Sequence, residues 1–408
     1  MSAPGGPRPS HDDEGPLGAP SSAPSGAVGV PDGLLTLPEP ARSRWHRAGL
    51  GRRGERWFNV IAATWLLLFA VGWTWTVAEA RPGRAGAPAP SAGAMVASAL
   101  TNPDAPTAAF VTDAAMDAMV PRGLSGKLRA VFTLPGGSLE DDAAESAAAS
   151  HADTVLAVAD SAAGAAPGRA PARSGIFGLA VRVREAVRPV SGYNVVTLVP
   201  YEHLQNGRIG QYLLGSWPAA RANLAKRGDY SRPEGFIEVT PQNQDTQVSE
   251  HFRLRDFLTH NQGNVWPKYL VLRIKNVDKV ELVMNELNGR GIKTGTVRVL
   301  SGFRTPSYNA GGGNTTGRAT MSRHMFGDAA DIFVDNDGNG SMDDLNGDGK
   351  VNIGDSRVIC DAVETVERAH PELIGGCGVY PGTSSHGPFA HIDTRGYRAR
   401  WTGSGDGG

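Results

Sequence analysis

The sequence has little cysteine and no overall excess of charge of either sign. Only Cys360 and Cys377 occur in 408 residues, too few for a fold built on disulfides. Their spacing is not the C-x-x-C of a zinc ribbon or a redox motif. They are either two buried free thiols or one disulfide, and the sequence leaves both open. The formal net charge is -1, so no general basic character indicates a nucleic-acid partner, and we expect none.

Charge is missing altogether from one long stretch. Residues 57–78 carry no charged side chain and are largely apolar between 60 and 73, which is long enough for a helix that crosses a hydrocarbon layer of ~30 Å. Arginines are denser before the stretch than after it, so we expect the N-terminus inside and the rest outside. The sequence thus predicts a single-pass protein of the cytoplasmic membrane with a periplasmic catalytic domain, or a secreted protein if cleavage follows Ala80.

Glycine and proline are abundant, with 53 and 28 residues, and they concentrate in the first half of the chain. Such composition is typical of segments that do not fold. We therefore expect a disordered cytoplasmic tail at 1–56, the transmembrane helix at 57–78 and a low-complexity linker at 79–175. Alternating apolar and polar residues then predict a small β module at 176–248. The remaining domain, 249–402, carries the chemistry.

Three segments of this last domain contain candidate metal ligands. His324 offers an imidazole nitrogen, and Asp331 offers a carboxylate oxygen at the start of an apolar strand pattern. His391 lies in a second short apolar stretch and would complete a set of three. These atom types suit Zn²⁺, and three protein ligands leave a fourth position for water, as in catalytic zinc sites. Zinc lowers the pKa of such a water toward neutrality.

The segments also match the motifs of a known family. Residues 322–331 contain a complete S-x-H-x-x-G-x-A-x-D pattern, 301–309 read S-G-F-R-T-P-S-Y-N, and 391–395 read H-x-D-x-R. In this order they resemble the zinc D-alanyl-D-alanine carboxypeptidase family of peptidoglycan peptidases, over roughly residues 249–401. The resemblance implies that His324, Asp331 and His391 bind zinc, that Arg304 stabilises the oxyanion, and that Ser322 helps to hold the substrate.

The resemblance further implies a zinc metallopeptidase of the carboxypeptidase or endopeptidase type, acting on the peptide stems of peptidoglycan. Many relatives have an acidic residue three positions before the last histidine ligand, where this chain has Pro388. Asp393 is the best substitute as general base, or else it orients a ligand. His386 is the second choice. The missing base also leaves open a catalytically inactive, zinc- and calcium-bound domain that binds cell wall or protein.

An acidic loop at 335–355 separates the second and third zinc ligands. Its oxygen side chains at alternating positions suit Ca²⁺, and the second half resembles the calcium loop of dockerins and EF-hands. The ligands expected there are Asp344, Asn346, Asp348, the Lys350 carbonyl, Asn352 and Asp355. A possible second site begins with Asp335, Asp337 and Asn339, but its twelfth position, Asn346, already belongs to the other. A solvated loop without an ion is the alternative. We expect calcium to order this edge of the active site.

The fold class expected from these patterns is α+β. It consists of a small, mostly antiparallel sheet with flanking helices and a zinc site, preceded by the β module, the membrane helix and the disordered linkers.

Overall fold

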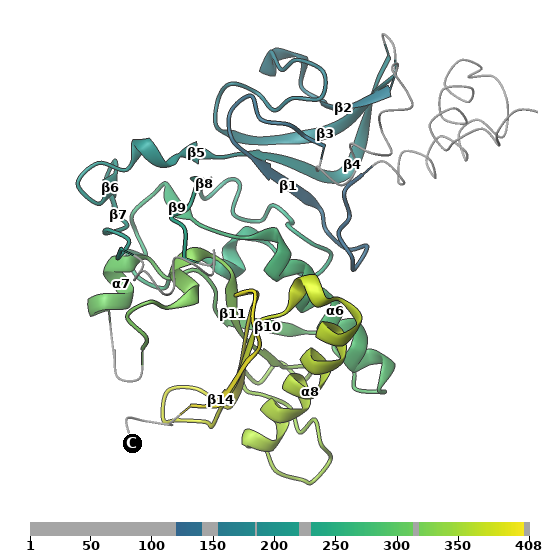
Figure 1. Cartoon of the computed structure of the whole chain (residues 1–408), viewed down its shortest axis with the longest axis vertical. Coiled ribbons are helices and arrows are strands. Elements are labelled where there is room, and N and C mark those ends of the chain that lie inside the picture. The colour runs from purple at the N-terminus through teal and green to yellow at the C-terminus, as the bar shows by residue number, and fades with distance from the viewer. Residues whose placement is uncertain (1–119, 141–153, 184–185, 220–229, 313–317, 404–408) are drawn as a thin grey trace, which may run out of the picture. The chain divides into compact units, whose positions relative to one another are not determined.

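The computed structural model describes residues 120–140, 154–183, 186–219, 230–312 and 318–403 (Figure 1). The expected tail, the expected membrane helix at 57–78 and much of the expected linker lie outside these residues. Within them, no helix has the length and apolar character needed to cross a membrane. The two long helices, α6 (Ile274–Gly289) and α8 (Ile353–Ala369), carry charged residues along their length. The expected single-pass membrane location is therefore not borne out by the described residues.

The expected α+β class is also wrong, because the described residues form a sheet-rich fold. They contain four sheets and three α-helices, the third being the short α7 (Pro306–Gly311). Strands rather than helices supply most of the core, since many short apolar runs pair with one another. Short 3-10 helices occur at Ser161–Ala163, Tyr201–His203, Leu254–Phe257, Arg323–Phe326 and Pro371–Leu373.

A four-stranded sheet in the order β1-β4-β3-β2 comes first along the chain. Its strands are β1 (Ala130–Thr133), β2 (Thr154–Val158), β3 (Gly175–Val183) and β4 (Ala186–Thr197). Strands β1 and β2 lie within the range expected to be linker, because their apolar residues pair with the later strands in spite of the alanine-rich composition around them. Leu156 and Leu179 are buried in the core of this sheet.

Two smaller sheets follow. Strands β5 (Val199–Pro200), β8 (Gly235–Val239) and β9 (Lys268–Leu270) form one, and β6 (Arg208–Ile209) pairs with β7 (Tyr212–Leu213). One hydrophobic core joins Val239 and Val248 to Val277 and Ile332. The core therefore continues across residue 248, where we expected one domain to end and the next to begin.

The last sheet has five strands in the order β10-β11-β13-β12-β14. They are β10 (Val297–Ser301), β11 (Ala329–Val334), β12 (Gly376–Tyr380), β13 (Phe389–Asp393) and β14 (Ala399–Thr402). Helices α6 and α8 pack against each other, and α8 packs against β12 and β13 (Figure 1). This sheet and its helices position the candidate site.

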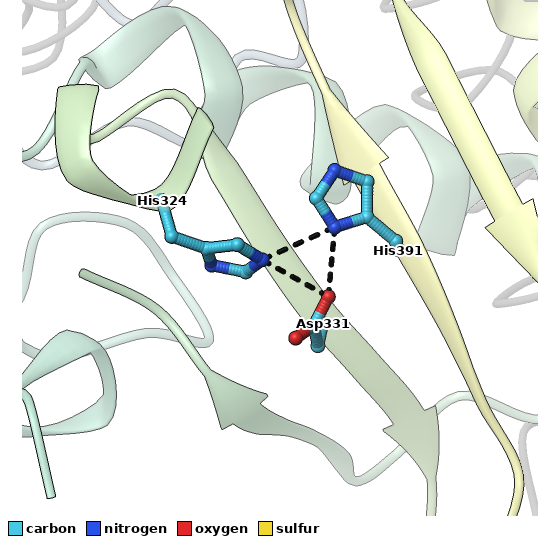
Figure 2. A group of neighbouring side chains, drawn as sticks. All are labelled: His324, Asp331 and His391. Carbon is cyan, nitrogen blue, oxygen red and sulfur yellow. Dashed lines mark hydrogen bonds and ion pairs between the residues drawn. The ribbon is translucent and has the colours of Figure 1, made fainter. Parts of the chain in front are cut away.

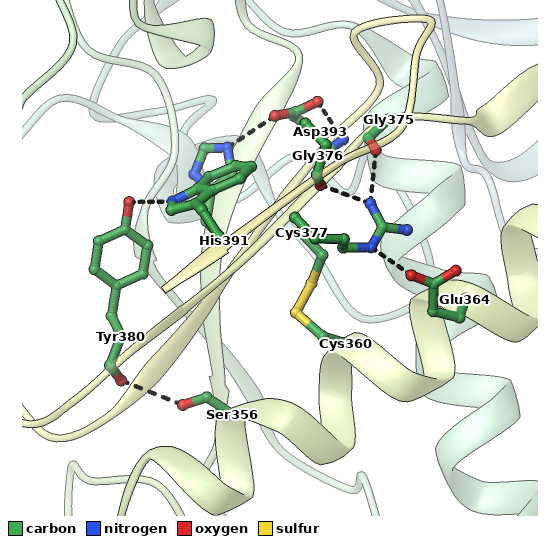
Figure 3. Close-up of a disulfide and its surroundings, with 12 residues drawn as sticks. Ser356, Cys360, Glu364, Gly375, Gly376, Cys377, Tyr380, His391 and Asp393 are labelled. Atoms are coloured by element: carbon green, nitrogen blue, oxygen red, sulfur yellow. Dashed lines mark hydrogen bonds and ion pairs between the residues drawn. A yellow bond between two sulfur atoms is a disulfide. The ribbon is translucent and has the colours of Figure 1, made fainter. Parts of the chain in front are cut away.

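A disulfide joins Cys360 of α8 to Cys377 of β12, with the two Cα atoms 5.8 Å apart (Figure 3). Of the two alternatives that the sequence left open, the structure has the bonded pair. The bond fixes the helix to the strand next to β13, which carries His391.

Candidate metal centre

One row of residues crosses all five strands of the last sheet. Residues paired across neighbouring strands have side chains on the same face, and the pairings run in sequence through Ser301, Asp331, His391, Gly378 and Trp401. Asp331 and His391 are therefore direct cross-strand neighbours, although 60 residues separate them in the chain. The sheet register thus brings two of the predicted ligands together.

The third predicted ligand comes from outside the sheet. His324 belongs to the 3-10 helix Arg323–Phe326, which ends at Gly327 in a left-handed conformation with φ of 70°. A Cβ at Gly327 would lie 2.5 Å from the Val271 carbonyl oxygen, so glycine alone fits both the turn and the close approach. This turn leads the chain from His324 directly into β11 and Asp331.

The three side chains converge on a small triangle of ligand atoms (Figure 2). His324 Nε2 lies 3.1 Å from His391 Nδ1 and 3.2 Å from Asp331 Oδ1. His391 Nδ1 lies 2.8 Å from the same Oδ1. A tetrahedral zinc ion with bonds of ~2.0–2.1 Å places its ligand atoms about 3.3 Å apart. The observed triangle is close to that size.

The other nitrogen of each imidazole has a partner that fixes which nitrogen is protonated. His324 Nδ1 donates to the Gly302 carbonyl oxygen at 2.7 Å, because a carbonyl only accepts. His391 Nε2 lies 3.0 Å from Asp393 Oδ2 (Figure 3). Each ring therefore keeps one nitrogen, inside the triangle, for a metal. Metal-binding histidines in proteins are held in this way.

Asp393 is fully engaged and orients His391. Its Oδ1 accepts from the Gly376 backbone N–H at 2.8 Å, and the Arg395 side chain donates to both carboxylate oxygens. It is completely buried. Of the two roles that the sequence left open, the contacts favour orientation of a ligand over general base.

The environment sets the charge of the ligands. Burial, aided by the Arg304 guanidinium, lowers the pKa of His324 to about 4. Burial raises the pKa of Asp331, but interactions with His324 and Arg304 outweigh it and hold that pKa well below its usual range. Burial lowers the pKa of His391, whereas its hydrogen bonds to Asp331 and Asp393 raise it, and the net shift is upward. A cation at Nδ1 would replace the proton that this arrangement favours.

Arg304 lies beside the triangle. It donates to Asp331 Oδ2 at 2.6 Å and to Ser301 Oγ at 2.8 Å, and 18% of its side chain is exposed. Arg304 therefore fixes the carboxylate oxygen that does not face the histidines. Ser322, predicted to hold substrate, is buried at the start of the 3-10 helix that carries His324.

His386, the second candidate base, lies elsewhere. Its ring packs edge-on against Phe389, with centroids 5.1 Å apart, and its Nδ1 bonds the Gly387 carbonyl oxygen. It lines a small cavity together with Leu300 and Met342. These contacts turn His386 toward the acidic loop, and none of them joins it to the triangle.

Two aromatic residues beside the triangle, Tyr380 and Trp401, are not predicted from the sequence. The Trp401 ring covers Gly378, where a Cβ would lie 2.3 Å from the indole, and its centroid lies 5.2 Å from that of His391. Its Nε1 donates to the Tyr380 hydroxyl at 2.9 Å. Gly378 itself was a signal, because a glycine inside a strand often marks a close approach.

The acidic loop places its oxygen side chains in two groups. In the second half, Asn352 and Asp355 cap α8 reciprocally, and Asp355 also accepts from the N–H groups of Leu345 and Asn346. Asp344 and Asp348 are exposed. The carboxylates that do gather are in the first half: Asp335, Asp337 and Asp343. Asn339, expected with them, bonds Asp337 through its side chain.

Comparison with known proteins gives no further identification: no family model, no curated protein and no solved structure matches the chain.

Proposed function

We propose that this chain is a zinc peptidase that hydrolyses peptide bonds in bacterial peptidoglycan. The observation that carries the proposal is the convergence of His324 Nε2, His391 Nδ1 and Asp331 Oδ1. The distances between these three atoms suit ligands of one zinc ion. The substrate class rests on the resemblance of 301–309, 322–331 and 391–395 to the motifs of peptidoglycan peptidases.

The donor set fits zinc better than other common ions. Two imidazole nitrogens and one carboxylate oxygen form a set that zinc accepts, whereas calcium and magnesium prefer oxygen alone. Three ligands leave room for a fourth, and bound zinc would supply an activated water and polarise a carbonyl.

The chain's own residues prepare the site for that chemistry. Asp393 and the Gly302 carbonyl orient the two imidazoles so that His391 Nδ1 and His324 Nε2 point into the triangle. Arg304 steadies Asp331 and brings a permanent positive charge to the edge of the triangle. In the proposed reaction this charge stabilises the oxygen that becomes negative when a peptide carbonyl is attacked.

A second candidate function is a non-catalytic domain that binds cell wall or protein and retains the metal. Two observations favour it: Pro388 stands where relatives have the acidic base, and the Asp393 carboxylate already accepts three partners. A general base needs a free acceptor within reach of the water.

Digestion of peptidoglycan separates the two functions. The full chain, loaded with zinc and supplied with calcium, is incubated with peptidoglycan, and the soluble fragments are identified by mass spectrometry. His324→Ala removes one ligand, and His370→Ala is the matched control, because His370 is partly exposed beside Glu372 in another part of the fold.

A peptidase gives new fragments with the wild type and with His370→Ala but not with His324→Ala, and the fragment masses identify the bond. A wild-type chain that binds one zinc ion and releases no fragment would reject hydrolysis and favour the binding domain.

A further inference from the structure

Three carboxylates meet beyond the end of strand β11. Asp335, Asp337 and Asp343 each contribute one oxygen, and these oxygens lie within 4.8 Å of one another. Calcium binds oxygens at ~2.3–2.6 Å, so it accommodates ligand oxygens up to about 5 Å apart across the ion. Like charges this close repel each other unless a cation lies between them.

The backbone closes this loop at its base. The Asp335 N–H donates to the Thr296 carbonyl oxygen at 2.9 Å and so extends the pairing of β10 with β11. The Asp343 N–H donates to the Val334 carbonyl oxygen at 2.8 Å. Met342 is buried in the main core. The chain therefore leaves the sheet at Asp335 and returns beside it at Asp343, so two of the three carboxylates are held by the scaffold.

One oxygen of Asp335 lacks a partner, which is an observation independent of the clustering. Asp335 is only 1% exposed. Its Oδ2 accepts from the Arg298 side chain and from the Gly340 N–H, whereas its buried Oδ1 has no hydrogen-bond partner. Buried acceptors in proteins are nearly always satisfied by a donor, a water or an ion. An ion at Oδ1 accounts for both the unpaired oxygen and the neighbouring carboxylates.

We infer that Asp335, Asp337 and Asp343 bind one divalent cation of the calcium type, with Asp335 Oδ1 as its buried ligand. Every side-chain ligand atom in this cluster is a carboxylate oxygen, which favours a hard cation over zinc. Backbone carbonyls and water complete its six to eight ligands. The inference does not depend on the proposed function, since a non-catalytic domain would bind the same ion.

Asp160, which lies outside the acidic loop, provides a matched control. Asp160 is exposed, like Asp337, and each carboxylate accepts from an N–H two residues further on. Replacement of either residue by asparagine removes one charge and preserves the shape. A difference between the two variants therefore reports the position of the ion and not general acidity.

The test is calcium titration by isothermal calorimetry on the full, chelator-treated chain with zinc restored. We compare wild type, Asp337→Asn, Asp343→Asn and the control Asp160→Asn. Calcium affinity falls at least about tenfold in the first two variants, because affinity follows the number of charged ligands. The control retains the binding event. Circular dichroism verifies that each variant is folded, and calcium raises the melting temperature of wild type but not of Asp337→Asn.

Three results would overturn the inference. One is no binding by the wild type at millimolar calcium, and another is unchanged binding in both Asp337→Asn and Asp343→Asn. The third is an equal loss of binding in Asp337→Asn and the control Asp160→Asn. Peptidoglycan digestion is recorded separately, so failure of this site and failure of the proposed peptidase remain distinguishable.

Discussion

Two clusters of candidate metal ligands belong to one strand and its continuation, yet they differ in chemistry and setting. Asp331, inside β11, meets two buried imidazoles. Asp335, directly after β11, meets one exposed and one half-buried carboxylate. Four residues of extended chain span about 13 Å, so these are separate sites. Positions four residues apart can therefore present different sets of ligand atoms when one lies inside a packed sheet and the other lies where the strand ends in a loop.

The two clusters are also held by different means. In the His324–Asp331–His391 triangle, every ligand has a second hydrogen-bond partner, and Arg304, Gly302 and Asp393 supply them. In the acidic cluster, the backbone closes the loop while one Asp335 oxygen stays unpaired. We therefore expect the triangle to depend on its supporting residues and the acidic cluster to depend on its ion.

The largest effect is expected from the removal of Lys279, a buried lysine that contacts Asp393, the residue that holds His391. Lys279 Nζ donates to Glu367 Oε1 and to the Asp393 carbonyl oxygen, both at 2.7 Å. Loss of one partner of a buried pair costs about 3–5 kcal/mol. Lys279→Met should lower the free energy of unfolding by about 3 kcal/mol, near the lower limit because Arg400 still pairs with Glu367. Urea unfolding measures the change.

An exposed ion pair serves as the control for that variant. Arg232 and Glu202 are both more than half exposed, so Arg232→Met should change the free energy of unfolding by less than about 1 kcal/mol. Equal effects of the two substitutions would show that the lysine gives the site no special support.

Removal of the disulfide should have an effect of similar size. Cys360 and Cys377 are separated by 17 residues, and a closed loop of that length contributes about 3 kcal/mol. The double variant Cys360→Ser with Cys377→Ser should be less stable by this amount in thermal and urea unfolding. Reduced wild-type protein provides the reference. A double variant as stable as the oxidised wild type would contradict a stabilising bond between α8 and β12.

The support from Asp393 can be tested without removal of a ligand. Asp393→Asn keeps the size of the side chain but leaves a single acceptor oxygen for the donors Gly376 N–H, Arg395 and His391 Nε2. The His391 imidazole should then lose its fixed orientation, and zinc binding should weaken about 10–100-fold. Competition with a chromogenic chelator measures the change. Calcium binding at the acidic cluster should not change. Unaltered zinc affinity would contradict the role given to Asp393.

The smallest expected effect is a dependence on pH away from both clusters. Burial raises the pKa of Glu364, but hydrogen bonds from Arg398 and Arg400 outweigh it and lower the pKa overall. A lowered pKa stabilises the fold above the unfolded value of about 4.3, and this contribution disappears as the pH falls through the folded value. Glu364→Gln should cost less than about 1 kcal/mol at pH 7. The difference should shrink below about pH 4, and a constant difference down to pH 2 would be inconsistent with this assignment.

The sequence predicted the residues of the triangle, but not how they are brought together. The spacing of His324, Gly327 and Asp331 within one motif made the first two ligands readable. The pairing of Asp331 with His391 depends on the register of β11 and β13, which no local pattern contains. The same register decides that Trp401 covers Gly378.

Other features depend on tertiary contacts that no local pattern contains. In the loop at 344–355, which the spacing predicts to bind calcium, Asp355 also caps α8. Asp343 was not predicted as a ligand, because its position depends on the return of the chain to Val334. The alanine-rich range 79–175 resembled a linker, yet it contains β1 and β2.

The central claim is that zinc binds in the His324–Asp331–His391 triangle, and X-ray absorption at the zinc edge tests it most directly. The full chain is loaded with one equivalent of zinc in the presence of excess calcium. Zinc bound in the triangle should have four nitrogen or oxygen ligands at about 2.0–2.1 Å, and two of them should show the outer-shell scattering of imidazole. His324→Ala should lose one imidazole. A spectrum with oxygen ligands only, unchanged in His324→Ala, would contradict the account.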